Sequence, residues 1–69
     1  MKYKVGQKLI WLVRDFDGSL DIPCVVSAIF EAHCIADTDD DRHLWIDTDT
    51  EEDFIDYEVY KKKKHHDKI

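Results

Sequence analysis

A dense block of acidic residues at positions 37–60 most limits what this chain can fold into. Eleven of its side chains are carboxylates and only Arg42 opposes them, so the block has a formal charge of −10. Unpaired charges are costly to bury, so these carboxylates must lie on turns and on outward faces. The same block also contains enough apolar residues to need a buried side, and we therefore expect an amphipathic structure.

The apolar residues of this block recur at every second position. Leu44 and Ile46 fall on one face of residues 43–48, and Trp45 falls on the other face. Residues 54–60 alternate again, with Ile55, Tyr57 and Val59 on one face. A period of two residues is typical of strands with one buried side. We therefore expect two strands here, and a turn or bulge near residues 49–53 because the parity slips by one.

The first half of the chain is electrically balanced and contains three apolar runs of strand length. Residues 8–14 and 24–30 are rich in β-branched residues, and residues 34–37 follow a short polar break. A helix over residues 26–36 is the alternative interpretation, but the paired valines Val25 and Val26 favour strand. Turn-forming residues lie at positions 17–18 and 38–41. The sequence thus predicts five antiparallel strands and an all-β fold.

We expect one domain over residues 1–60, because a chain of 69 residues has room for one small core. Residues 61–69 carry five lysines and one aspartate without periodicity, and we expect a disordered basic tail there. The expected core is a set of inward apolar side chains: Val5, Leu9, Trp11, Val13, Val25, Ala28 or Ile29, Ile35, Leu44, Ile46, Ile55, Tyr57 and Val59.

The chain resembles the small SH3-like barrels of the KOW and Tudor kind over roughly residues 3–60. The resemblance rests on the opening Val5-Gly6-Gln7-Lys8-Leu9, a long first loop and later strands at hairpin spacing. Short acidic domains with this outline are similar to phage-encoded accessory proteins. The resemblance implies a closed barrel that binds peptide, protein or nucleic acid and has no enzymatic activity. It does not extend to RNA contact of the KOW type, because Ser27-Ala28 stands where that motif has a glycine.

Metal binding and catalysis are poorly supported by the sequence. Zinc ligands could come from Cys24, His33, Cys34 and His43, but adjacent residues of a strand point to opposite faces. The aspartates at 39–41 lack the glycine and bidentate glutamate of a calcium loop. The carboxylates lie on turns and outward faces, where none would acquire the shifted pKa of a catalytic acid. We expect no metal and no cofactor.

The sequence also indicates the cellular compartment of the protein. No apolar run approaches the ~18 residues of a membrane span, and no signal peptide is recognisable at the start of the sequence. We therefore expect a reduced, cytoplasmic setting, which would be a host cytoplasm for a phage protein. Cys24 and Cys34 are then expected to be free, buried thiols, with a disulfide as the alternative.

A partner-binding face is the functional hypothesis that the pattern favours. If the last two strands pair, aromatic side chains gather among carboxylates on the outward side, as in a protein-binding patch that steers a basic partner. The residues concerned are Trp45, Asp47, Asp49, Glu51, Phe54, Asp56, Glu58 and Tyr60. A simpler interpretation places Trp45 in the core.

Two forms of this hypothesis differ in the partner. Asp47, Asp49 and Glu51 on an extended strand would repeat at roughly 6.6–6.8 Å and could mimic nucleic acid toward a basic, nucleic-acid-handling host protein. The alternative is direct nucleic-acid binding through the lysines, with Trp11 or Tyr3 stacking on bases. The net charge of −6 favours a basic protein partner.

Overall fold

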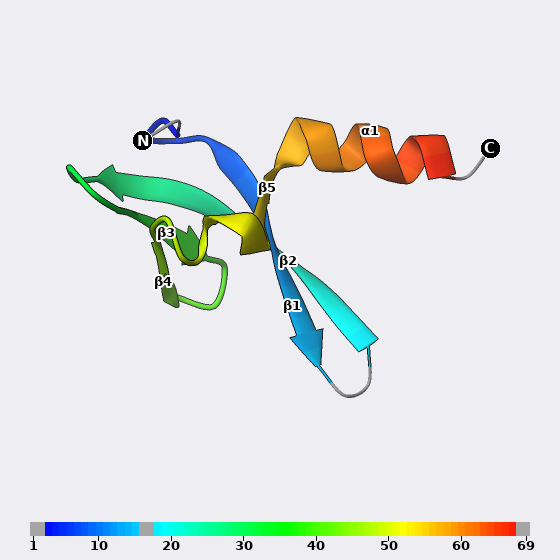
Figure 1. Ribbon diagram of the computed structural model, residues 1–69, viewed down its shortest axis with the longest axis horizontal. Helices are drawn as coiled ribbons and strands as arrows, with labels where there is room; N and C mark the ends of the chain where they lie inside the picture. The colour runs from blue at the N-terminus through cyan, green and yellow to red at the C-terminus, as the bar shows by residue number, and fades with distance from the viewer. Residues whose placement is uncertain (1–2, 16–17, 68–69) are drawn as a thin grey trace.

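The computed structural model describes residues 3–15 and 18–67. Five antiparallel strands form one sheet in the order β4-β3-β2-β1-β5, and a helix projects from it (Figure 1). The elements in chain order are β1 Lys8–Asp15, β2 Gly18–Ile29, β3 Cys34–Thr38, β4 His43–Ile46, the single 3-10 turn η1 Glu51–Asp53, β5 Phe54–Asp56 and α1 Tyr57–Asp67. Each pair of neighbouring strands is antiparallel.

The five antiparallel strands expected from the sequence are confirmed, and the alternative helix over residues 26–36 is wrong. The closed SH3-like barrel is not formed, because β4 and β5 are the two edges of the sheet and do not pair with each other among the described residues. The expected long first loop is also absent. β1 pairs with β2 from Lys8↔Val25 to Asp15↔Gly18, so the strands form one long hairpin.

The core lies on one face of the sheet, which curls around it. Its largest fully buried side chains are Leu9 of β1, Ile46 of β4, Val26 of β2 and Cys34 of β3. The buried cluster contains Tyr3, Leu9, Cys24, Val26, Cys34, Ala36, Ile46 and Phe54, with Trp11 and Leu44 packed against it. A bulge in β2 leaves Ser27 without a partner residue in β3, and bulges increase the local twist of a strand.

Several of the expected core residues lie outside the core. Val5 is 65% exposed, Val25 41% and Val59 48%. Val25 pairs with Asp37 in an outward row, and Val59 belongs to a helix. The expectation of free, buried thiols at Cys24 and Cys34 is confirmed. Both cysteines lie in the core cluster, where their small side chains allow close packing.

The expected strand over residues 54–60 is confirmed only for β5, Phe54–Asp56. From Tyr57 to Asp67 the chain is the helix α1, so the strand over residues 57–60 and the disordered tail are wrong through residue 67. Asp56 begins α1, because its Oδ1 accepts hydrogen bonds from the backbone N–H of Glu58 at 2.9 Å and of Val59 at 3.3 Å. The Asp56 Oδ2 accepts a bond from Gln7 at 2.8 Å. The Tyr60 hydroxyl donates to Asp21 of β2 at 2.5 Å. These contacts attach the first half of α1 to the sheet.

Replacing Ile46 with alanine should lower the free energy of unfolding by about 2–5 kcal/mol, because its side chain is fully buried. Ile46→Val should lower the same free energy by only about 0.5–1.5 kcal/mol, so this variant can still be measured if Ile46→Ala does not fold. The matched control Val25→Ala, on the outward face, should change the same free energy by about 0.5 kcal/mol or less. Urea denaturation followed by fluorescence measures all three, and equal losses at positions 46 and 25 would contradict the assignment of faces.

Replacing Asp56 with alanine should reduce the helical circular dichroism signal and lower Tm, because α1 loses its N-cap and its link to Gln7. Asp56→Asn is the control, since asparagine is an equally good N-cap but carries no charge. It should retain most of the helical signal. If both variants kept the full signal, α1 would not depend on this cap.

Candidate functional site

The outer face of β2, β3 and β4 carries a row of apolar side chains. The register pairs Ala28 with Ile35 and Ile35 with Trp45, so these three residues lie side by side across the strands. Trp45 is 53% exposed. Its neighbours along the chain, Leu44 and Ile46, point to the core side. The outward position of Trp45 therefore agrees with the alternation in the sequence.

Trp45 is the end of a stack of three aromatic rings. Its ring lies 3.6 Å from the ring of His33, centroid to centroid, with 10° between the planes. His33 in turn lies 4.7 Å from Phe30, with 19° between their planes. Phe30 is 52% exposed, whereas His33 is half-buried between its neighbours. We call Phe30, His33 and Trp45 the aromatic stack.

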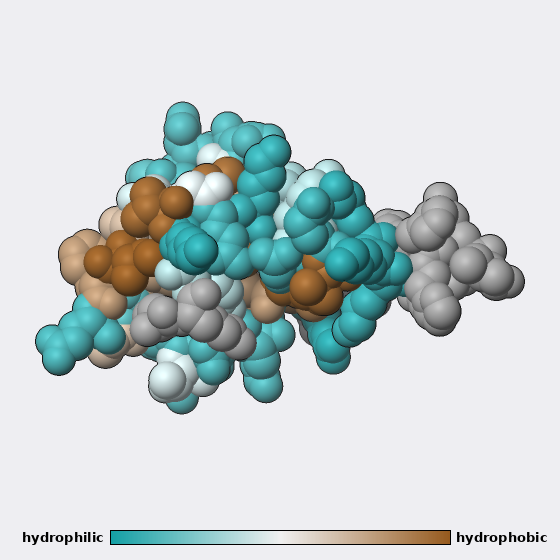
Figure 2. All heavy atoms as spheres, turned by 90° about the horizontal axis from the view of Figure 1, so that it is seen from above, coloured by the Kyte–Doolittle hydropathy of each residue, from teal (hydrophilic) through white to brown (hydrophobic). Residues whose placement is uncertain are grey.

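Apolar side chains gather at the end of the molecule away from α1 (Figure 2), which is the end where β2 turns into β3 (Figure 1). Phe30 and Ile29, at the end of β2, are both exposed there. Exposed apolar residues scattered singly need no explanation, but a group of them with an ordered aromatic stack is typical of a binding surface.

Asp47 holds the loop that follows Trp45. Its Oδ2 accepts a hydrogen bond from the Trp45 indole at 2.7 Å, and its Oδ1 accepts bonds from the backbone N–H of Asp49 at 2.9 Å and of Thr50 at 3.2 Å. The Trp45 bond is the largest of the effects that lower the pKa of Asp47. Asp47 is thus an ionised carboxylate that fixes the edge of the tryptophan ring.

The backbone edge of β4 is only partly open to another strand. Thr38 donates its backbone N–H to the carbonyl of Arg42, so these two residues form a hydrogen-bonded pair. Bonded and non-bonded pairs alternate along an antiparallel ladder, so His43 and Trp45 are in non-bonded pairs with β3. Their backbone N–H and C=O groups therefore point to the outer edge of β4. The Trp45 carbonyl already accepts a bond from the Thr50 hydroxyl at 3.1 Å. Because β4 is only four residues long and one of its edge-directed groups is already bonded, an added strand would gain few hydrogen bonds, and the side-chain face is the better surface for binding.

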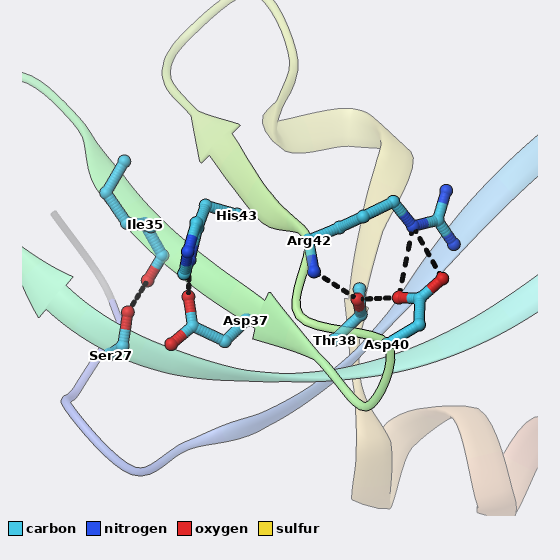
Figure 3. Close-up of polar contacts among 7 residues, drawn as sticks. All are labelled: Ser27, Ile35, Asp37, Thr38, Asp40, Arg42 and His43. Atoms are coloured by element: carbon cyan, nitrogen blue, oxygen red, sulfur yellow. Dashed lines mark hydrogen bonds and ion pairs between the residues drawn. The ribbon is translucent and has the colours of Figure 1, made fainter.

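An acidic side chain and a histidine form an ion pair next to the apolar row. His43 Nδ1 lies 2.7 Å from Asp37 Oδ1, and the two residues are cross-strand partners (Figure 3). The bond to Asp37 raises the pKa of His43, and the same bond lowers the pKa of Asp37. The Ser27 hydroxyl donates to the Ile35 carbonyl at 3.3 Å and satisfies the backbone at the bulge.

The turn between β3 and β4 is closed by its own side chains (Figure 3). The Thr38 hydroxyl bonds Asp40, and Arg42 Nε lies 3.0 Å from Asp40 Oδ2. Asp41 has a φ of 65°, a left-handed conformation that aspartate tolerates better than most residues. In residues 3–15 and 18–67 no group of three or more metal-ligating side chains could hold an ion.

The structure separates the eight residues that the sequence placed on one binding face. Trp45, Asp47 and Asp49 remain together, and Glu51 is in η1. The expected extended row of Asp47, Asp49 and Glu51 does not exist, because β4 ends at Ile46 and a turn follows. This removes the geometric basis for nucleic-acid mimicry by that row.

Phe54 does not lie beside Trp45 on the outside, as expected, but is buried. Its ring stacks on Trp11 at 6.3 Å, and the two residues are cross-strand partners of β5 and β1. Asp56 caps α1, and Glu58 and Tyr60 belong to α1, where Glu58 pairs with Lys61 at 2.7 Å. These four residues are therefore not part of the surface around Trp45.

Sequence reasoning missed two members of the aromatic stack. Phe30 was assigned to a strand and His33 to a polar break, yet Phe30 and His33 flank a break of only two residues. Phe30 donates its backbone N–H to the His33 carbonyl at 2.8 Å, which closes the turn and brings both rings together. An aromatic residue on each side of a two-residue turn was the available signal.

A concave region lies next to the start of α1. A hollow of about 220 Å³ is lined by Pro23, Val25, Asp39 and Tyr57, among others. The Nζ of Lys61 lies 4.9 Å from the centre of the Tyr57 ring. The nearest thiol is unreactive, because burial raises the pKa of Cys24 to about 11.

Comparisons with protein-family models, curated proteins and solved structures found no match to this chain. Within the described residues, no helix is both long enough and apolar enough to cross a membrane.

The ion pair between His43 and Asp37 should be visible in pH titrations. The raised pKa of His43 adds stability that is fully present below its ordinary value of 6.5 and lost as pH rises through the folded value. The lowered pKa of Asp37 adds stability present above 3.8 and lost as pH falls through the folded value. We expect the pair to be complete between these limits.

NMR titration of the imidazole should give a pKa above 6.5 for His43, and Asp37→Asn should bring it back toward 6.5. Asp53→Asn removes an exposed carboxylate on η1 and should leave His43 unchanged. A His43 pKa that did not respond to Asp37→Asn would show that the pair does not form.

Proposed function

We propose that this protein is a non-enzymatic binding domain that captures a basic partner protein through the aromatic stack and the apolar row beside it. The single observation that carries this proposal is Trp45, a large aromatic side chain that is held in one orientation by His33 and Asp47 and yet is 53% exposed. Ordered, exposed tryptophans are the residues that most often supply the binding energy of protein interfaces.

The charge of the surroundings supports a basic partner. Asp47 and Asp49 follow Trp45, and Glu31 lies between the two other rings of the stack in sequence. Arg42 is the only arginine or lysine in residues 37–60, and it is paired with Asp40. Acidic groups around an aromatic anchor attract a cationic surface and raise the association rate, with a strong dependence on salt.

A small acidic domain of this kind fits the role of a modulator that occupies a functional surface of a basic, nucleic-acid-handling protein. The resemblance to phage accessory proteins supports the same role, with a host protein as the partner. The regular acidic row that would imitate a phosphate backbone is not formed. Recognition in this proposal therefore depends on Trp45 and on the negative electrostatic potential of the surrounding carboxylates.

Direct nucleic-acid binding is the competing function, and one observation favours it. Lys61, Lys62 and Lys63 are exposed on α1, which projects from the sheet (Figure 1). Lys61 is already paired with Glu58, and its pKa is raised by that bond. DNA binding at low salt that is lost on neutralising these lysines, and unaffected by Trp45→Ala, would favour this function.

Affinity capture from a cell lysate, read by mass spectrometry, tests the proposed function. Trp45→Ala should remove most of the captured protein, because the interface loses its anchor. Leu20→Ala, an equally exposed apolar residue on the β1-β2 hairpin, is the matched control and should capture as the unaltered protein does.

The charge contribution is tested by a matched pair of double variants. Glu31→Lys with Asp49→Lys reverses two charges near the stack, and Glu52→Lys with Asp53→Lys reverses two on η1. The first should weaken capture more than the second at equal net charge. Asp47 is left unaltered, because it holds the loop. Full capture by both Trp45→Ala and the first double variant would disprove the proposed face.

A further inference from the structure

Trp45 has one covered ring face and one open ring face. His33 lies parallel to the indole at 3.6 Å, which is van der Waals contact and leaves no room for another group on that side. Since 53% of the residue is still exposed, the opposite face and part of the ring edge must be in contact with solvent. A planar group placed there would extend the aromatic stack by one layer.

The open face has the electrostatic character of a cation site. The face of an indole carries negative potential from its π electrons. The Asp47 carboxylate accepts the indole N–H at 2.7 Å, which adds a negative charge at the ring edge, and the lowered pKa of Asp47 keeps that charge at neutral pH. Asp49 is exposed on the same turn. A cation over the ring would therefore find carboxylates beside it.

The shape of the site selects among cations. A guanidinium is planar, can lie parallel to the indole and still direct N–H groups sideways to carboxylates. An ammonium is compact, strongly hydrated and cannot stack. A nucleobase is also planar, but its phosphates would be repelled by Asp47 and Asp49. The combination of stacking surface and carboxylates thus fits arginine best.

We infer that the open face of Trp45 binds the guanidinium of an arginine in a flexible cationic segment of the partner protein, as the fourth layer of the aromatic stack. This inference rests on the proposed function and specifies the chemistry of the partner. Because the backbone edge of β4 is partly occupied by Thr50, the arginine side chain, rather than added strand pairing, provides the recognition. The segment then needs arginines but little else in its sequence.

Three peptides of equal length test this, each a Gly-Ser chain with four evenly spaced arginines, lysines or citrullines. NMR titration of the full chain follows the indole N–H of Trp45. The arginine peptide should shift this signal and bind about three- to tenfold more tightly than the lysine peptide, in line with a cation-π contact at a partly exposed site. Citrulline keeps the planar shape without the charge, and its peptide should not bind measurably.

Variants separate the role of the ring from that of the charge. Trp45→Ala should remove the difference between arginine and lysine, and Trp45→Phe should keep part of it, because phenylalanine retains a smaller π face. Leu20→Ala should leave all three affinities unchanged. The dispersion of the amide spectrum confirms that each variant is folded.

The outcomes distinguish this inference from the proposed function. Equal affinity for arginine and lysine peptides would overturn the inference, and the proposed function would stand if Trp45→Ala still abolished protein capture. A shift of the Trp45 signal by oligothymidylate, but not by the arginine peptide, would replace the inference with base stacking. If no peptide bound and capture survived Trp45→Ala, both would be wrong.

Discussion

The pairing register of β3 and β4 is the constraint on which the rest of the structure depends. Cys34 and Ala36 point into the core and face Ile46 and Leu44 across the hairpin, so Ile35 and Trp45 must point out. A slip of one residue would exchange the two faces and expose Ile46. The turn prevents that slip, because Thr38, Asp40 and Arg42 bond one another across it. The aspartate-rich turn therefore determines where the candidate binding surface lies.

Many of the acidic side chains have structural roles of this kind. Asp40 closes the β3-β4 turn, Asp47 organises the next loop, and Asp56 caps α1. Hydrogen bonds lower the pKa of all three, so each is ionised when the fold is intact. The acidic block thus contains two kinds of carboxylate. Some stabilise turns, and others, such as the exposed Asp49, contribute to the negative electrostatic potential at the surface.

The sequence predicted the parts of the fold that follow from alternation. Five antiparallel strands and the outward side of Trp45 came from a period of two residues. The position of Phe54 was wrong because β5 has only three residues and its pairing with Trp11 turns the ring into the core. The helix was missed because residues 54–60 alternate as a strand does, and the rest of α1 is lysine and histidine without an apolar stripe. Only the Asp56 cap marked its start.

The candidate site was likewise predictable only in part. Trp45 and its neighbouring carboxylates could be found from the sequence, but the aromatic stack depends on a two-residue turn that brings Phe30 and His33 together in space. Closure of the barrel could not be predicted from strand count alone. Whether two edges meet depends on how far the sheet curls, and here the curl leaves β4 and β5 as separate edges.

The most direct measurement of the central claim, an exposed Trp45 in an acidic field, is collisional quenching of its fluorescence. Trp11→Phe leaves Trp45 as the single tryptophan. Neutral acrylamide should quench it efficiently, and at low salt caesium ions should quench it more strongly than iodide, because nearby carboxylates attract cations and repel anions. Protection from acrylamide, or iodide quenching that equals caesium quenching, would show that the ring is buried or that its surroundings are not acidic.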